Sequence, residues 1–275
     1  MSKNDRQLDA ATVRAEAARF LAQQVALGGP WVILPAKTAA SPTCEKASTP
    51  VPVVSLPEES PPEESAPTPP VPEESWNAPD GRVVTGSPRR IRLAKLFYEV
   101  RNCRSCTLGA TRKRFVFGAG SPDPRVVLVG EAPGAEEDRR GLPFVGPAGQ
   151  LLDELMTAVG LSRQRNVFIC NVLKCRPPGN RDPLPTEVNA CDSILRRQLE
   201  IFQPQILIAL GRFAAQSLTG KQVPMARLRR RLHQHHGIPL IATYHPAYVL
   251  RNPAARAQVE ADFREAALQI GLITS

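Results

Sequence analysis

A carboxylate and an aromatic ring occur close together in residues 127–146, VLVGEAPGAEEDRRGLPFVG. Glu131 stands in a turn rich in glycine and proline, directly after an apolar run, and Phe144 follows in the same stretch. In sheets built from alternating strands and helices, ligands bind outside the carboxyl ends of the strands. These residues therefore indicate a site for a flat, polar ligand. An ordinary connection between a strand and a helix explains them equally well.

Four of the six cysteines lie near predicted loops or helix ends, namely Cys103, Cys106, Cys175 and Cys191. Four thiolates hold either zinc or an iron–sulfur cluster. Fifteen residues separate Cys175 from Cys191, which is unusual for a zinc ribbon. Buried thiols without a metal are the alternative. Cys170 alternates with apolar neighbours, so we expect it in the core.

The elements that must position these residues form an alternating series. Four short apolar runs predict strands, at residues 125–129, 166–172, 205–210 and 239–243. Helical patterns lie around them, at residues 89–100, 150–159, 186–202, 212–218 and 254–270. This alternation is typical of a parallel sheet covered by helices on both faces.

The chain divides into three parts by composition. Residues 1–38 form an arm with apolar spacing typical of an amphipathic helix at residues 5–27, which either docks on a partner or stays marginal alone. Residues 39–86 form a linker rich in proline and glutamate, in which Pro-Glu-Glu-Ser occurs three times; such a segment buries too little apolar surface to fold. Residues 87–275 form the folded domain.

Charge points to a polyanionic partner. The chain has a net charge of +9, yet residues 39–80 hold eight acidic residues and one basic residue, which leaves +16 for the rest. Nucleic acid is the first candidate, and a basic surface that only confers solubility is the alternative. No apolar run spans a membrane, and charges interrupt any secretory signal pattern near the N-terminus. We therefore expect a cytoplasmic protein without structural disulfides.

A set of short motifs occurs in order along the predicted folded domain. They are Cys103-x2-Cys106, GEAPG at 130–134, GLPFVGPAGQLL at 141–152, NVLKCRPPGNRDP at 171–183, Cys191, LGR at 210–212 and YHPAYVLRNP at 244–253. Together they resemble the family 4 uracil-DNA glycosylases, the iron–sulfur type. The resemblance covers about residues 93–271, and the N-terminal arm lies outside it.

The resemblance implies a three-layer α/β/α fold with a central four-stranded parallel sheet. It also implies a structural [4Fe–4S] cluster on Cys103, Cys106, Cys175 and Cys191. The protein would flip uracil out of DNA and hydrolyse its N-glycosidic bond, leaving an abasic site for base excision repair. No lysine is expected to form a Schiff base, so the enzyme would not cut the strand.

The same resemblance assigns roles around the base. Phe144 would stack on uracil, and Asn171 would read its edge, because an amide donates to O4 and accepts from N3–H. His245 would donate to O2, where negative charge develops. Glu131 would position or activate water and stabilise the cationic sugar, with Glu137 in a supporting role.

Further contacts follow from the resemblance. The backbone amides of Ala132 and Gly134 would contact the base. Leu250 and Arg251 would enter the minor groove and fill the space left by the flipped nucleotide. Basic residues would hold phosphates, namely Arg229 and Arg230 with their neighbours in 227–231, and Arg112, Lys113 and Arg114.

One departure from the family concerns residues 228–231, Leu-Arg-Arg-Arg, where members commonly carry an Arg-Gly step. We expect this change to alter duplex contacts and not the chemistry.

The expected partner is uracil-containing DNA, single- or double-stranded, bound by a monomer, with a protein partner for the arm. The alternative function is a non-catalytic iron–sulfur DNA-binding module of the same fold. Some relatives of the family bond covalently to DNA after they release uracil, and they carry a basic, His-containing insertion after the second strand. Residues 174–180 contain no such histidine, so we do not expect a covalent mode here.

Overall fold

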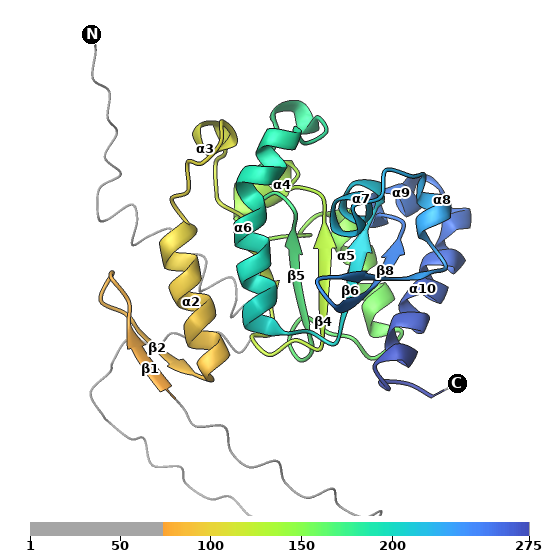
Figure 1. The fold of residues 1–275 in the computed structure, drawn as a ribbon, viewed down its shortest axis with the longest axis horizontal. Coiled ribbons are helices and arrows are strands. Elements are labelled where there is room, and N and C mark those ends of the chain that lie inside the picture. The colour runs from red at the N-terminus through yellow and green to blue at the C-terminus, as the bar shows by residue number, and fades with distance from the viewer. Residues whose placement is uncertain (1–73, 275) are drawn as a thin grey trace, which may run out of the picture.

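The four apolar runs form the centre of a six-stranded sheet (Figure 1). They are β4 (Val126–Gly130), β5 (Val167–Asn171), β6 (Ile206–Leu210) and β8 (Ile238–Thr243). These strands run parallel in the order β5-β4-β6-β8, and every residue of β4, β5 and β6 is buried. Continuous apolar runs are typical of parallel strands covered on both faces. The predicted parallel sheet is confirmed.

Two short antiparallel strands extend this sheet at its edges. β3 (Ala119–Gly120) pairs with β5, and β7 (Leu232–His235) pairs with β8. The sequence analysis did not predict them, because neither carries an apolar run. The sheet is therefore mixed, with a parallel centre of four strands.

Helices cover both faces of the sheet, as a three-layer α/β/α fold requires. Alternate residues of β4 divide between two cores: Val127 and Val129 pack with α2, α6 and α7, and Val126 and Leu128 pack with α5 and α10. The longer helices are α2 (Pro88–Val100), α5 (Pro147–Thr157), α6 (Pro185–Phe202), α7 (Arg212–Thr219) and α10 (Arg256–Gln269). All five confirm predicted helices, with small shifts at their ends.

Short helices complete the connections. They are α3 (Leu108–Thr111), α4 (Ala135–Arg140), α8 (Met225–Leu228) and α9 (Pro246–Arg251), with 3-10 turns η1 (Pro178–Asn180) and η2 (Pro253–Ala255). Within the part of the chain that the structure describes, no helix is long and apolar enough to cross a membrane.

This computed structural model describes residues 74–274, and the expected helix at residues 5–27 lies outside them. The described part begins with a hairpin of β1 (Glu74–Asn77) and β2 (Val83–Gly86). Trp76 packs edge-on against Tyr98 of α2 at 5.4 Å, and the Tyr98 hydroxyl donates to Asp80 at 2.8 Å. The predicted linker boundary at residue 86 is therefore wrong: residues 74–86 pack on the folded domain.

Arg229, predicted to hold DNA phosphate, is instead a buried structural residue. Its guanidinium binds both carboxylate oxygens of Asp262 at 2.8 and 3.0 Å and lies 4.5 Å from the Tyr244 ring centre. Asp262 also accepts from the Thr243 hydroxyl at 2.6 Å. Both charged side chains are only 6% exposed, so this guanidinium is held by Asp262 of α10 and is not free at the surface.

Arg230 next to it is exposed, in keeping with a phosphate contact, but it has a φ of 57°. A side chain in this left-handed region crowds its own backbone, at a cost of roughly 1–2 kcal/mol. It lies within residues 228–231, where members of the family commonly carry an Arg-Gly step. The departure noted in the sequence thus places a strained residue in the turn after α8.

Replacing Arg230 with glycine should stabilise the fold. Glycine relieves the backbone strain, although its greater freedom in the unfolded chain offsets part of that gain. We therefore expect the free energy of unfolding to rise by about 0.5–1 kcal/mol. Urea denaturation of the purified protein measures it. Arg230→Ala is the matched control, because alanine keeps the Cβ; equal stabilisation by both variants would show that lost charge, and not backbone strain, is responsible.

Candidate active site

The four parallel strands end side by side, and this brings the predicted site residues together. Gly130 at the end of β4 lies opposite Asn171 at the end of β5, and Leu210 of β6 lies opposite Thr243 of β8. Glu131 follows Gly130, and His245 comes two residues after Thr243. The chain turns from β5 back across β4 to reach β6, so strand order reverses at β4, where such sheets form their ligand crevice.

A cavity of about 460 Å³ opens at this edge of the sheet. Its walls include all four residues predicted to meet the base, Glu131, Phe144, Asn171 and His245. The predicted juxtaposition of these residues therefore exists in the structure. The role of each is a separate question, taken up below.

Phe144 and Asn171 meet over the end of β4 because residue 130 has no side chain. A Cβ at Gly130 would lie 2.3 Å from Asn171 Oδ1 and 2.9 Å from the Phe144 ring. Phe144 and Asn171 are 7% and 2% exposed. Among residues 74–274, no hydrogen bond occupies the Asn171 side-chain amide, so its donor and acceptor remain available to a ligand.

His245 is the N-cap of α9 and presents one ring nitrogen to the cavity. Its Nδ1 accepts a hydrogen bond from the backbone N–H of Ala247 at 3.1 Å, so Nδ1 carries no proton. Burial and then the positive charge of Arg251 lower the pKa of His245 to about 4. The imidazole is therefore neutral at pH 7, with its proton on Nε2. Its ring lies roughly parallel to that of Phe144, 5.4 Å between centres.

Glu131 faces the same cavity as a carboxylate with a perturbed affinity for protons. Burial raises the pKa of Glu131, the negative charge of Asp182 raises it further, and the positive charge of Arg212 lowers it. Arg212, the first residue of α7, lies 3.5 Å from Asp182 across the exposed rim. A raised carboxyl pKa in a cavity is typical of a functional acid or base.

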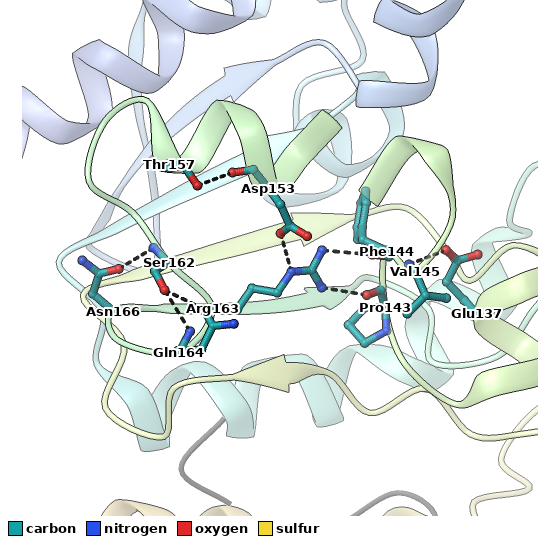
Figure 2. A network of polar contacts seen from close by, with 10 residues as sticks. All are labelled: Glu137, Pro143, Phe144, Val145, Asp153, Thr157, Ser162, Arg163, Gln164 and Asn166. Atoms are coloured by element: carbon teal, nitrogen blue, oxygen red, sulfur yellow. Dashed lines mark hydrogen bonds and ion pairs between the residues drawn. The ribbon is translucent and has the colours of Figure 1, made fainter. Parts of the chain in front are cut away.

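Glu137, predicted to support the water, instead holds the loop around the cavity. One carboxylate oxygen accepts from the Gly134 N–H at 3.1 Å. The other accepts from the Val145 N–H at 3.0 Å (Figure 2). The Gly134 amide is therefore occupied, which argues against its predicted contact with the base. Of the two amides predicted to contact the base, only that of Ala132 lacks a hydrogen bond within the described residues.

The rim beside His245 carries the predicted groove-binding residues. Leu250 of α9 is 49% exposed, and Arg251 lines the cavity. Tyr248, also on the cavity wall, stacks on Tyr244 at 5.0 Å, and Tyr244 in turn lies under Arg229. Arg229 thus supports this rim from behind.

The four predicted cysteine ligands come from separate segments and converge beside α2. Cys103 and Cys106 precede α3, Cys175 follows β5, and Cys191 lies in α6, all packed on the same core. Burial raises the pKa of both Cys175 and Cys191, and neighbouring cysteines raise it further: Cys106 and Cys103 act on Cys175, and Cys175 and Cys103 act on Cys191. Burial raises the pKa of the Cys191 thiol to about 11. A thiolate there requires a nearby cation.

Within residues 74–274, no three histidine, cysteine or acidic side chains lie close enough to share one metal ion. Four cysteine thiols are the donor set that an iron–sulfur cluster takes, so the residue types fit such a group. Cys170 is fully buried inside β5, which confirms its predicted place in the core.

Arg112, predicted to contact phosphate, lies against the cysteines instead. Its guanidinium donates to Cys175 Sγ at 3.2 Å and to the Cys103 carbonyl at 2.7 Å. The sequence analysis missed three residues of the site's surroundings: Arg181 on the cavity wall, Asp182 beside it in an ion pair with Arg212, and Arg163 behind the cavity. Asp182 and Arg181 stand within the NRDP part of a motif, and that position was the available signal.

Comparisons with known proteins agree with this geometry. The model of the uracil DNA glycosylase superfamily matches residues 117–269. A type-4 uracil-DNA glycosylase of Archaeoglobus fulgidus is 43% identical over 181 residues, which cover 63% of this chain and 90% of that protein. One of Thermotoga maritima is 46% identical over 155 residues, covering 56% and 80%. A type-5 enzyme of Thermus thermophilus is 33% identical, covering 48% and 68%.

The chain therefore belongs to the uracil DNA glycosylase superfamily, within its type-4 family of uracil-DNA glycosylases.

The protonation of His245 is directly measurable. Nitrogen NMR of the histidine rings should show His245 as the neutral Nε2–H tautomer at neutral pH, with a pKa of about 4. Arg251→Gln should raise that pKa, because it removes a positive charge, and should leave the tautomer unchanged. A neutral ring protonated on Nδ1 would contradict the geometry, since Nδ1 could not then accept from Ala247.

Proposed function

We propose that this cavity receives a uracil flipped out of DNA and hydrolyses its bond to the sugar. The protein is a uracil-DNA glycosylase, a hydrolase of N-glycosyl bonds that acts in DNA repair. The observation that carries the site assignment is the convergence of Glu131, Phe144, Asn171 and His245 on one cavity at the strand ends. Each role below is our assignment.

Phe144 and Asn171 recognise the base. The buried Phe144 ring offers a flat apolar face on which uracil stacks. The Asn171 amide donates to O4 and accepts from N3–H. Cytosine presents the opposite pattern at both positions, a donor at N4 and an acceptor at N3, so it leaves buried polar groups unpaired.

His245 stabilises the leaving base. Cleavage of the bond leaves negative charge on uracil, and a fixed donor at O2 lowers the energy of that anion. The Ala247 N–H holds the ring so that Nε2–H is the free donor.

Glu131 serves the sugar side of the reaction. Its carboxylate orients or activates the water and stabilises the cationic character that develops on the sugar. No side chain or backbone group of the described residues hydrogen-bonds to this carboxylate, so its oxygens are available. No lysine lines the described cavity, in agreement with simple hydrolysis that leaves the strand intact.

DNA is held at the rim. Exposed Leu250 and Arg251 enter the minor groove and fill the space vacated by the flipped nucleotide, and Arg230 contacts the backbone. Arg229 and Arg112 are excluded from this role by their contacts within the protein. Insertion of the single apolar side chain of Leu250 is compatible with both single- and double-stranded DNA.

Cys103, Cys106, Cys175 and Cys191 hold a [4Fe–4S] cluster with a structural role. Bound there, it supplies a rigid link among the α2–α3 loop, the end of β5 and α6. The buried thiols would ligate as thiolates, which the metal deprotonates despite their raised pKa. Arg112 at Cys175 supplies a further positive charge.

The catalytic assignment is tested on an end-labelled oligonucleotide with one uracil. Wild-type protein should yield cleavage at uracil only after alkali treatment, which marks an abasic site. Glu131→Gln should lower the single-turnover rate by about 10²–10⁴-fold, the usual contribution of a positioned acid or base. Glu136→Gln, an exposed partner of Arg139 in the same loop region, should not change it. Full activity of Glu131→Gln would overturn the role.

An inactive wild-type sample with its iron present would favour the non-catalytic DNA-binding module instead. Binding to uracil-containing DNA without excision would then be the expected property. Cleavage of the DNA strand before alkali treatment would contradict simple hydrolysis.

The cluster is tested by iron content. The purified protein should hold about four irons per chain with matching labile sulfide. Cys191→Ala should lose iron and unfold at lower temperature, whereas Cys170→Ala, at an equally buried cysteine, should keep its iron. Equal iron in both variants would contradict the ligand set.

A further inference from the structure

The backbone that carries the Phe144 ring is bent into an unfavourable conformation. Phe144 has a φ of 53°, in the left-handed region that side chains rarely occupy. Such a residue persists only where its surroundings force the conformation, and such strain is frequent at functional sites. The ring itself is almost fully buried in the cavity wall.

A guanidinium behind the cavity binds the backbone at this bend, at residues 143 and 144. Arg163, in the turn between α5 and β5, donates from Nη1 to the Pro143 carbonyl at 3.0 Å and from Nη2 to the Phe144 carbonyl at 2.9 Å (Figure 2). Its Nε donates to Asp153 of α5 at 2.6 Å. The side chain is only 7% exposed. One rigid plane thus fixes two successive carbonyls and ties them to α5.

The rest of the bend is held from other directions. Glu137 accepts the Val145 N–H at 3.0 Å, and a Cβ at Gly149 would lie 1.9 Å from the Phe144 carbonyl oxygen. The carbonyl therefore packs tightly on the start of α5 and points to Arg163. With the backbone clamped on both sides of residue 144, the direction of the ring is set.

Arg163 does not line the cavity, so it reaches a bound base only through this backbone. We propose that Arg163 is a positioning residue that sets the Phe144 ring for stacking on uracil. This proposal rests on the function proposed above. A lysine offers no planar fork and cannot satisfy both carbonyls and Asp153 in the same way, so the geometry is specific to arginine.

The experiment is a double-mutant cycle on single-turnover excision. Arg163→Lys and Arg163→Gln should each slow the wild-type enzyme by on the order of ten- to a hundred-fold, the range that a small misplacement costs. In a Phe144→Ala background the same substitutions should have little further effect, because no ring remains to be positioned. Affinity for undamaged duplex should stay unchanged.

Arg165→Gln is the matched control, since Arg165 stands in the same turn and its side chain makes no hydrogen bond to the site in the described structure. Its single-turnover rate should equal that of the wild-type enzyme. If Arg163→Gln does not fold, as judged by its thermal transition, Arg163→Lys and Asp153→Asn are used in its place in the double-mutant cycle. Asp153 is half-exposed, so its loss is tolerated.

Two results would overturn the proposal: wild-type rates in the Arg163 variants, or an equal slowing with and without the Phe144 ring. The second would show a general structural role. Failure of the proposed function is distinguishable, because it would appear as an inactive wild-type protein before any variant is compared.

Discussion

The absence of a side chain at Gly130 is the constraint on which the site depends. At the end of β4 the backbone approaches both the Asn171 amide and the Phe144 ring, and any Cβ there would overlap them. The parallel register sets Gly130 opposite Asn171, so the Asn171 amide and the Phe144 ring meet at one point. The rest of the site, from Glu131 to His245, is built outward from this contact.

Burial acts on the two titrating groups of the cavity in opposite senses. It raises the pKa of Glu131 and lowers that of His245, and in both cases it favours the neutral form. For His245 the result is a neutral imidazole whose Nε2–H is a hydrogen-bond donor. For Glu131, Asp182 and Arg212 at the rim have opposing effects on its pKa, so the balance of charge at the cavity mouth governs this carboxylate.

The sequence was sufficient to predict the central strands and the longer helices, because continuous apolar runs and helical spacing do not depend on distant residues. It also placed Glu131, Asn171 and His245 at strand ends, where parallel strands must converge. The edge strands β3 and β7 were not predicted, because both are short and neither carries an apolar run. The β1–β2 hairpin was assigned to the linker, because the third Pro-Glu-Glu-Ser repeat runs into β1.

Charged residues were the least predictable part. Arg229 stands in a run of arginines that suggests an exposed surface, yet its partner Asp262 lies 33 residues away. Arg163 resembles any polar residue of a turn, and only the folded backbone reveals that it binds the carbonyls of Pro143 and Phe144. Both cases show that a buried guanidinium is defined by acceptors that local sequence does not contain.

The hairpin at the start of the described residues determines where the N-terminal 73 residues leave the domain. Glu74 pairs with Gly86, and the next residue, Ser87, donates its hydroxyl to Asp123, just before β4 begins. The described chain therefore begins at the amino ends of the central strands (Figure 1), whereas the cavity is lined by residues at their carboxyl ends. The start of the described chain and the candidate active site thus lie at opposite edges of the sheet.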